Sequence, residues 1–486
     1  MKEISKRYLV IGLSFLLMIV ISLITPPATL TSEAMSVLGI FAGCLLLWLT
    51  IGIDWPSLLC IVLVGFLPSM NFKSVLSGAF GGETFVFLLA TFLCTYALSQ
   101  TQFLRRCAIG FVTSKIAQKG PWYFTISFFA AVIVVGSFMS PTVMFVIFLP
   151  ILEEVYKVLN ISKGDKVGAM LMMGLAFCTS ISSGMTPIAH VFSIMAMGAY
   201  TKVTGKVIGY GEYMAFGIPV GIITVIIMIL LFKFLLKVDM SNIKKIDITH
   251  LKKSVTPIDT REIICIVVFL SVIALWVLPD LLKGPFPALI ATLKPYGTAM
   301  PPLVGAVILS IISVDKKQLL NPVEAMKNGV PWASLLMTAG TLTLGSAMTN
   351  KDIGLSKYLT DTFGANFSEM APMILVIIFA TWAAIQTNLS SNMVTVTVVT
   401  AVAIPITLAT KGAVNTAAVV SMIGLLASFA FATPPSMPHI ALAGSSGWTT
   451  VAQVFKYGGL LMIISIVITV VIGYPIASSI MENFIL

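Results

Sequence analysis

The sequence predicts an all-α polytopic membrane protein with eleven transmembrane helices and two re-entrant helical hairpins. Of its 486 residues, 58% are hydrophobic and only 10% are charged, and the mean hydropathy is +1.03. Apolar runs near the length of about 17 to 25 residues that a spanning helix needs recur from end to end, without the alternation typical of strands. Two runs carry polar residues at their centre, which favours helix, turn and helix over a single crossing.

The expected spans follow from hydropathy along the chain. The first span follows Lys2, Lys6 and Arg7 and resembles a signal peptide, but it is long and lacks a small-residue cleavage site. The spans are residues 7–25, 35–51, 54–69, 83–104, 166–200, 212–236, 261–279, 299–314, 330–350, 412–445 and 452–480. The hairpins are residues 122–158 and 370–410.

The basic residues favour one topology. With a cytoplasmic N-terminus, 21 of the 29 Lys and Arg residues fall on the cytoplasmic side and 8 outside, which satisfies the positive-inside rule and places the C-terminus outside. The net charge of +10 therefore reports topology, and nucleic-acid binding is not expected because no basic patch accompanies aromatic residues in a soluble module. The six cysteines lack metal-ligand spacing and are expected in the core.

A polar segment near the midpoint divides the chain into two related halves. Landmarks recur about 250 residues apart, as with Ser140 and Ser391 or Pro187 and Pro434. Because corresponding spans would enter the membrane from opposite sides, the repeat is inverted, an architecture typical of secondary transporters that bind their solute near the midplane. The expected units are 1–34 with the first span, 35–236 as the first repeat, 237–260 as a cytoplasmic loop and 261–486 as the second repeat.

Each half contains two polar interruptions. In the first half, "GSFMSPTVMF" (136–145) at the hairpin tip precedes "CTSISSGMTPIAH" (178–190) in the next helix; in the second, "TNLSSNMVT" (387–395) precedes "FATPPSMPH" (431–439). Proline removes an amide donor and glycine permits a sharp turn, so a helix interrupted there exposes backbone dipoles. Amides at a half-helix N-terminus favour an anion, and unwound carbonyls with hydroxyl oxygens favour a small cation.

An alternative interpretation of the hairpins stays open. Each hairpin arm of about 17 to 20 residues measures about 25 to 30 Å, so it is long enough to cross the membrane completely and to place its tip at the far surface. The matched interruptions in both halves favour the solute-binding interpretation.

The same residues resemble the divalent anion/sodium symporter family over nearly the whole chain. That family carries a Ser-Asn-Thr motif at each hairpin tip and a Thr-Pro-Pro break in the following helix. "SNMVT" at 391–395 and "ATPPS" at 432–436 match closely, "SPT" at 140–142 matches with one change, and the first break at 184–187 matches loosely. The resemblance implies a carboxylate transporter in the bacterial plasma membrane, a homodimer, and an elevator motion of a transport domain against a scaffold domain.

The resemblance also implies the site residues. The substrate carboxylates are expected at Ser140 and Thr142 of one tip and at Ser391 and Asn392 of the other. The remaining positions expected to bind substrate are Pro141, Gly184, Thr186, Pro187, Met393, Thr433 and Pro434. The candidate sodium ligands are Thr387, Asn392 and Ala432, and no other cofactor is expected.

Two departures from the family motif favour exchange over sodium coupling. Pro141 stands where the family has Asn, and Met393 stands where it has Thr, so neither side chain offers the hard oxygen that sodium prefers. Plastid 2-oxoglutarate/malate translocators and bacterial dicarboxylate exchangers of this kind swap carboxylates without a sodium gradient. We therefore expect exchange of dicarboxylates such as succinate, malate, fumarate or 2-oxoglutarate, with sodium-coupled symport of di- or tricarboxylates as the alternative.

His190 and His439 follow the two broken helices, 249 positions apart. They are candidates to offset the substrate charge or to carry a proton, and the alternative is that each is a neutral ring that caps freed carbonyls. An anion channel is less favoured because no ring of charged pore residues is evident. An enzyme is less favoured because no Ser–Lys pair, intramembrane Asp pair or phosphate loop is present.

Overall fold

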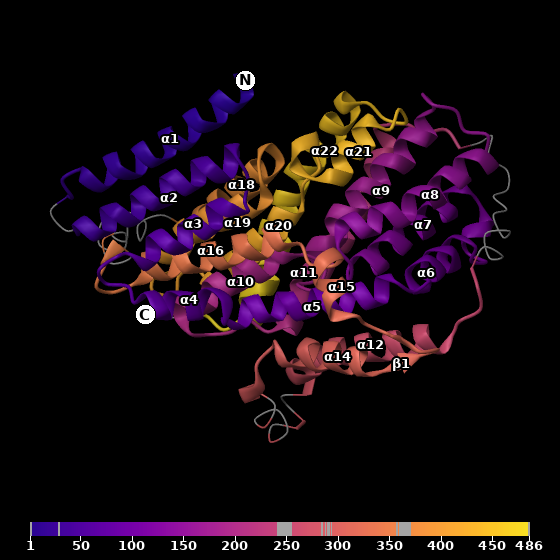
Figure 1. The fold of residues 1–486 in the computed structure, drawn as a ribbon. Coiled ribbons are helices and arrows are strands. Elements are labelled where there is room, and N and C mark those ends of the chain that lie inside the picture. Colours follow the sequence, from indigo (N-terminus) through magenta and orange to yellow (C-terminus); the bar gives the residue numbers. More distant parts are fainter. Residues whose placement is uncertain are drawn as a thin grey trace.

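The computed structural model is a bundle of helices with one short β-hairpin (Figure 1). It describes the chain except residues 1, 28–29, 241–254, 283–284, 287, 289–291, 293, 356–357, 359–370 and 485–486. Most of the expected loop 237–260, including His250, lies outside the described residues.

The first half contains the helices that surround the first expected hairpin. They are α1 (Lys2–Leu23), α2 (Ser32–Thr50), α3 (Trp55–Gly65), α4 (Phe72–Phe80), α5 (Glu83–Ser99), α6 (Phe103–Val112), the 3-10 turn η1 (Ala117–Lys119), α7 (Pro121–Gly136), α8 (Pro141–Val158), α9 (Lys166–Met185), α10 (Val191–Thr204) and α11 (Tyr210–Phe234).

The second half is also helical apart from two short strands, β1 and β2, which pair antiparallel. Its elements are α12 (Thr260–Leu282), η3 (Lys294–Tyr296), α14 (Met300–Ile311), β1 (Ser313–Val314), β2 (Lys317–Gln318), α15 (Pro322–Asn328), α16 (Trp332–Thr349), α18 (Pro372–Leu389), α19 (Asn392–Ala409), α20 (Thr416–Ser428), η4 (Pro434–Ser436), α21 (Pro438–Ser445), α22 (Val451–Ile468), the π-helical turn η5 (Thr469–Gly473) and α23 (Tyr474–Ile480).

Both stretches expected to form hairpins are pairs of helices joined by a short turn. Residues 137–140 join α7 to α8, and residues 390–391 join α18 to α19. The two helices expected to be broken are also interrupted, between α9 and α10 and between α20 and α21. The polar interruptions in the sequence therefore predicted all four helix ends correctly. Proline, which lacks the amide donor of a helix interior, stands at three of them, and the second tip is marked by its Ser and Asn residues alone.

Two expected spans end earlier than predicted. The span expected over 83–104 stops at Ser99, because the hydroxyl of Thr101 turns back to the Leu98 carbonyl at 2.7 Å and the chain restarts as α6. The span expected over 54–69 stops at Gly65 and is followed by the separate helix α4. In both places the apolar sequence extends beyond the last residue of the helix, so hydropathy alone placed the end of the span too late.

The membrane character of the protein is confirmed. Nine helical segments among the described residues are long and apolar enough to cross a membrane. The apolar helices α3, α7, α14 and α20 have 11, 16, 12 and 13 residues, which is below the roughly 17 residues of a crossing. The total of eleven crossings therefore stays a prediction.

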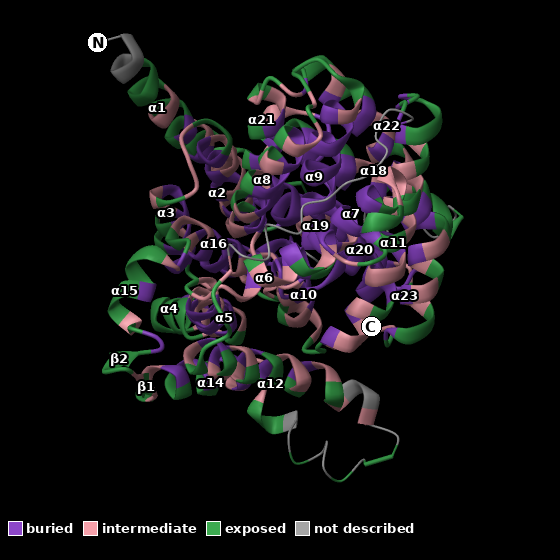
Figure 2. Ribbon diagram, turned by 90° about the vertical axis from the view of Figure 1, so that its right-hand side faces the viewer, coloured by how far each residue is buried: buried purple, intermediate pink, exposed green. Residues whose placement is uncertain are grey.

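The core lies around α9, α19 and α20, where buried residues dominate (Figure 2). α9 packs on α7, α8, α11 and α20, and every one of its residues from Gly168 to Met185 is buried. α1 lies at the edge of the bundle against α2, and α12 and α14 form a layer beside α5 and α11 (Figure 1). The two helix breaks thus follow α9 and α20, and the second hairpin tip leads into α19.

Candidate functional site

The first hairpin tip is held against the first helix break. The hydroxyl of Thr186, just after α9, donates a hydrogen bond to the carbonyl of Ser137 at the end of α7. A Cβ atom on Gly136 would overlap the Ser182 hydroxyl, so only glycine lets the tip approach α9 this closely. Thr186 is fully buried. This threonine therefore fixes the position of the tip.

The second hairpin tip is held by Asn388, which lies one turn before it on α18. The Asn388 side chain donates to the carbonyls of Ala384 and Phe429 at 2.9 and 3.1 Å. Its oxygen accepts the amides of Phe431 and Ala432 at 2.7 and 2.8 Å. One buried amide group thus satisfies three backbone groups where the chain leaves α20, which lowers the cost of unwinding a helix inside the protein.

The same threonine contact occurs in both halves of the chain. Thr433, which precedes Pro434 in the second break, donates its hydroxyl to the carbonyl of Asn388 beside the second tip. Thr186 precedes Pro187 in the first break and makes the equivalent bond to Ser137. In each half, a Thr-Pro break therefore holds the tip of the preceding hairpin.

The two breaks also meet each other across the interface of α9 and α20. A Cβ atom on Gly184 would lie 3.0 Å from the Phe429 ring and 3.1 Å from the Leu425 carbonyl, so the helices are in close contact there. The Gly184 carbonyl accepts a hydrogen bond from the Tyr213 hydroxyl at 3.0 Å, and that hydroxyl is also bonded to Ser193 at 2.6 Å. Tyr213 on α11 thereby satisfies a carbonyl that the end of α9 leaves free.

His439 connects the second break to α9. Its Nε2 lies 2.8 Å from the Ser180 hydroxyl, which donates its hydrogen to the Ala430 carbonyl at 2.7 Å. Because the hydroxyl has one hydrogen, Nε2 must be the donor toward it, which assigns the tautomer and leaves the buried Nδ1 as an acceptor without a partner among the described residues. His190 occupies the N-cap position of α10 without a capping side-chain bond, and its ring centroid lies 3.9 Å from that of Phe192, with the two rings tilted by 41°.

The expected substrate residues fall into two groups. Pro141, Gly184, Thr186, Pro187 and Met393 are buried, whereas Thr433 and Pro434 are half-buried. Ser140 and Ser391 are half-buried and occupy the N-cap positions of α8 and α19. Thr142 is exposed, and the Asn392 oxygen has no hydrogen-bond partner among the described residues. The four tip residues expected to hold carboxylates therefore keep free polar atoms, and the threonines of the breaks are committed to holding the tips.

The helix N-termini near these residues are open to an anion. The Ser140 and His190 side chains do not cap α8 and α10, and Ser391 caps α19 only weakly, with its hydroxyl 3.5 Å from the Val394 amide. Uncapped amides at a helix N-terminus carry partial positive charge and bind carboxylates.

The candidate sodium ligands are partly committed to other contacts. The Thr387 hydroxyl and the Asn392 amide nitrogen both donate to the Ala427 carbonyl, at 2.7 and 2.9 Å. The Asn392 oxygen and the Ala432 carbonyl accept no hydrogen bond from the described residues. These two oxygens have the chemistry of sodium ligands.

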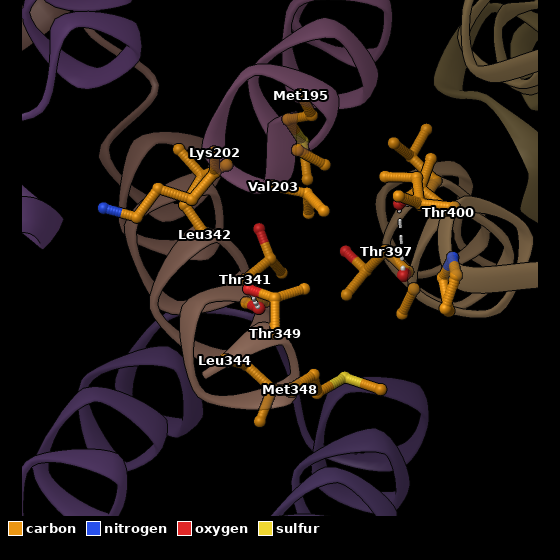
Figure 3. Close-up of a pocket in the computed structure, with 16 residues that line it drawn as sticks. Met195, Lys202, Val203, Thr341, Leu342, Leu344, Met348, Thr349, Thr397 and Thr400 are labelled. Carbon is orange, nitrogen blue, oxygen red and sulfur yellow. Dashed lines mark hydrogen bonds between the residues drawn. The ribbon is translucent and has the colours of Figure 1, made fainter. Parts of the chain in front are cut away.

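Four residues that position the site were not among the expected site residues. Ser180 and Tyr213 satisfy freed carbonyls from neighbouring helices. Ser180 stands in the polar interruption "CTSISSGMTPIAH", which is the signal that marks it, whereas no sequence signal marks Tyr213. Asn388 stands in the polar run "TNLSSN", which is the signal that marks it. Lys202 on α10 lines a cavity with Thr397 and Thr400 of α19 and Thr341 of α16, and its amino group points to the edge of this cavity (Figure 3).

A pair of neighbouring glycines tests the packing behind the second break. A Cβ atom on Gly458 of α22 would overlap the Phe431 carbonyl, whereas one on Gly459 would meet open space. We expect Gly458→Ala to lower the free energy of unfolding by about 2 kcal/mol or more, because backbone must move. Gly459→Ala is the matched control and should be neutral or slightly stabilising. Equal thermal midpoints for the two detergent-solubilised variants would contradict the close contact of α22 with the break.

Comparison with known proteins identifies the family. A family model described as citrate transporter matches residues 43–424, which is most of the chain. The chain belongs to this citrate transporter family. Membership in the citrate transporter family agrees with the resemblance to anion symporters, and it makes the protein an integral membrane transporter of the citrate and dicarboxylate type rather than a member of an enzyme family.

Two relatives of this citrate transporter family member share a little over a fifth of their residues with it. The sodium-dependent dicarboxylate transporter SdcS of Staphylococcus saprophyticus is 23% identical over 479 residues, covering 94% of this chain and 89% of the relative. An uncharacterized transporter of Haemophilus influenzae is 22% identical over 348 residues, 69% of each chain.

Two solved transporter structures share the fold. The YdaH transporter of Alcanivorax borkumensis has a TM-score of 0.56 at 12% identity, covering 83% of this chain and 87% of that chain. MtrF of Neisseria gonorrhoeae, from a class of antimetabolite efflux pumps, has a TM-score of 0.53 at 15% identity, covering 82% of each. At these identities the likeness concerns the fold alone.

Proposed function

We propose that the protein carries small dicarboxylates across the membrane between the tips of two re-entrant hairpins. Ser140 and Thr142 of the first tip and Ser391 and Asn392 of the second receive the carboxylates. The observation that carries this proposal is the threonine contact repeated in both halves, Thr186 to Ser137 and Thr433 to Asn388. Each contact holds one tip against a break and leaves the tip hydroxyls free for a solute.

Charge complementarity supports a dianion at this position. The N-termini of α8, α10 and α19 present amides that their cap side chains leave free or hold weakly. An uncompensated dianion in the membrane interior is costly, so these dipoles must offset its charge. In this proposal His190 and His439 add charge compensation when a proton binds the buried Nδ1, which in each ring has no partner among the described residues.

The proposed cycle is an exchange of one carboxylate for another by an elevator motion. In this cycle each protomer of a homodimer has a transport domain, which holds both hairpins, and a scaffold domain. The transport domain slides as a unit against the scaffold domain. Without substrate, the free polar atoms of the two tips have no partner and the transport domain does not move. With substrate bound, the transport domain crosses the membrane. Support for exchange comes from Pro141 and Met393, whose side chains lack oxygen ligands for sodium.

Sodium-coupled symport is the second candidate. The printed name of the staphylococcal relative includes dependence on sodium. Asn392 and Ala432 also retain free oxygens beside the second tip, and these residues would hold the ion.

Uptake into proteoliposomes tests the proposal. We expect labelled succinate to enter vesicles preloaded with unlabelled succinate or malate, and to enter empty vesicles at no more than background, whether sodium or choline is outside. Uptake into empty vesicles that a sodium gradient drives would reject exchange in favour of symport. Flux that neither saturates nor responds to internal substrate would indicate a channel.

Variants of the tips test the site. We expect Ser391→Ala and Ser140→Ala each to raise the KM for succinate about tenfold, because each removes a hydrogen bond to a charged ligand. Ser390→Ala is the matched control, since the Ser390 hydroxyl is already bonded to the Gln386 carbonyl at 3.0 Å. Unchanged KM values in both tip variants, at wild-type thermal stability, would place the substrate elsewhere.

A further inference from the structure

Lys202 stands at the junction of three adjoining cavities. The narrow cavity of Figure 3, about 40 Å³, runs between α10, α16 and α19. Two wider cavities, of about 260 and 310 Å³, lie beside α4, and Lys202, Gly78 and Leu342 line both. A Cβ atom on Gly78 would lie 3.4 Å from the Lys202 amino nitrogen. The side chain therefore reaches from α10 across to α4, and its charge faces the wider cavities.

The cavity of about 310 Å³ has the lining of an anion-binding site. It is large enough for a small carboxylate. Six polar side chains contribute to its wall, from the turn before α4, the start of α4 and the C-terminal half of α16 with its cap: Ser69, Asn71, Ser74, Thr343, Ser346 and Asn350. The Thr343 hydroxyl is buried, with the residue only 5% exposed, and it has no hydrogen-bond partner among the described residues. A buried donor without a partner is costly unless a ligand or water satisfies it.

The charges around this cavity favour an anion. Lys202 is the only ionisable residue in its lining, and it makes no ion pair or hydrogen bond with the described residues. Two carboxylates beside these cavities are hydrogen-bonded to neighbouring amides and hydroxyls and are not paired with Lys202. Glu33 accepts both the amide and the hydroxyl of Ser69, at 2.8 and 2.5 Å. Glu83, in the neighbouring cavity, accepts the amide and the hydroxyl of Thr298.

The narrow cavity extends from this position toward the second hairpin tip. Its wall on α19 extends from Pro405 to Val396, and Val396 lies about one helical turn from Asn392. At about 40 Å³ the narrow cavity is too small to hold a dicarboxylate, so a solute in the wider cavity is stopped beside Lys202.

We propose that this polar cavity is an entry site, in which Lys202 and the Thr343 hydroxyl bind the carboxylate of an arriving substrate before the hairpin tips receive it. The inference rests on the proposed transport of dicarboxylates and adds a second binding position on one side of the membrane. The charge of Lys202 raises the local concentration of a dianion, and the effect weakens as salt screens it.

The test compares Lys202→Ala with Lys202→Arg in vesicles of phosphatidylcholine, which contain no anionic lipid headgroup that could occupy the cavity. For succinate added on the side where residues 69–71 and Asn350 lie, we expect Lys202→Ala to raise KM about three- to tenfold at low ionic strength. The increase should shrink in high salt, and KM from the opposite side should stay unchanged. Lys202→Arg should keep a KM near that of the wild type, and Thr343→Val should raise KM about twofold.

Lys206→Ala is the matched control, because Lys206 lies four residues away and is paired with Glu482 outside the cavity at 3.2 Å. An equal KM for Lys202→Ala and wild type, or an equal loss in Lys202→Arg, would overturn the entry site. An effect seen only in vesicles with phosphatidylglycerol would assign the cavity to a lipid headgroup and would also overturn it. Wild-type protein that moves no di- or tricarboxylate would overturn the proposed function itself, so the two failures are distinguishable.

Discussion

Asn388→Ala is expected to abolish transport and to destabilise the protein by about 3 kcal/mol or more, since each buried backbone group left without a partner costs about 1 to 3 kcal/mol. The Asn388 side chain, 1% exposed, makes four hydrogen bonds to the backbone. Its removal leaves the amides of Phe431 and Ala432 and the carbonyl of Phe429 unsatisfied. The measurements are the thermal midpoint of the detergent-solubilised protein by tryptophan fluorescence and succinate exchange in proteoliposomes.

Ser390→Ala controls for a change in the same turn. Ser390 is half-buried and its hydroxyl returns to the Gln386 carbonyl within its own helix, so we expect a thermal midpoint and exchange rate near those of the wild type. If Asn388→Ala unfolded at the same temperature as Ser390→Ala, the backbone groups of residues 429–432 would have other hydrogen-bond partners in the variant. That result would remove Asn388 as the residue that stabilises the second break.

Arg106→Ala is expected to cost about 3 to 5 kcal/mol, because it leaves a buried carboxylate without its partner. Arg106 on α6 holds Glu262 on α12 in a two-pronged ion pair at 2.8 and 3.0 Å, and the Glu262 side chain is only 4% exposed. The hydrogen bond to Glu262 raises the pKa of the Arg106 guanidinium, so the guanidinium stays charged at any physiological pH. The pair ties the segment that leads into the first hairpin to the first span of the second half.

Two further variants sharpen this prediction. Arg106→Lys keeps the charge but loses the planar fork, so we expect a smaller loss of thermal stability than in Arg106→Ala. Lys206→Ala breaks an ion pair whose two side chains are 49% and 76% exposed, and no measurable change is expected. A midpoint for Arg106→Ala equal to that of Lys206→Ala would show that Glu262 finds water or another donor when the arginine is absent.

The sequence determined the class of the protein and the places where its helices are interrupted. Composition alone required membrane helices, because no other class tolerates 58% hydrophobic residues over 486 positions. The Pro-containing stretches at 140–142, 186–187 and 434–435 located three helix boundaries, since proline lacks the donor that a helix interior needs. These effects are local, so they can be read from neighbours in the chain.

Only the tertiary structure decided which polar groups hold the fold and which remain free for a solute. Thr186 and Thr142 are both threonines beside a proline, yet one is buried and bonded to Ser137 while the other is exposed. Asn388, Ser180 and Tyr213 each bond to a backbone group of another segment, which lies 43, 250 and 29 positions away along the chain, respectively. Lys202 likewise reaches the cavity lining only because α10 lies beside α4 in the fold. Hydrogen-bond satisfaction inside a membrane protein depends on contacts between distant helices, and the sequence order does not specify those contacts.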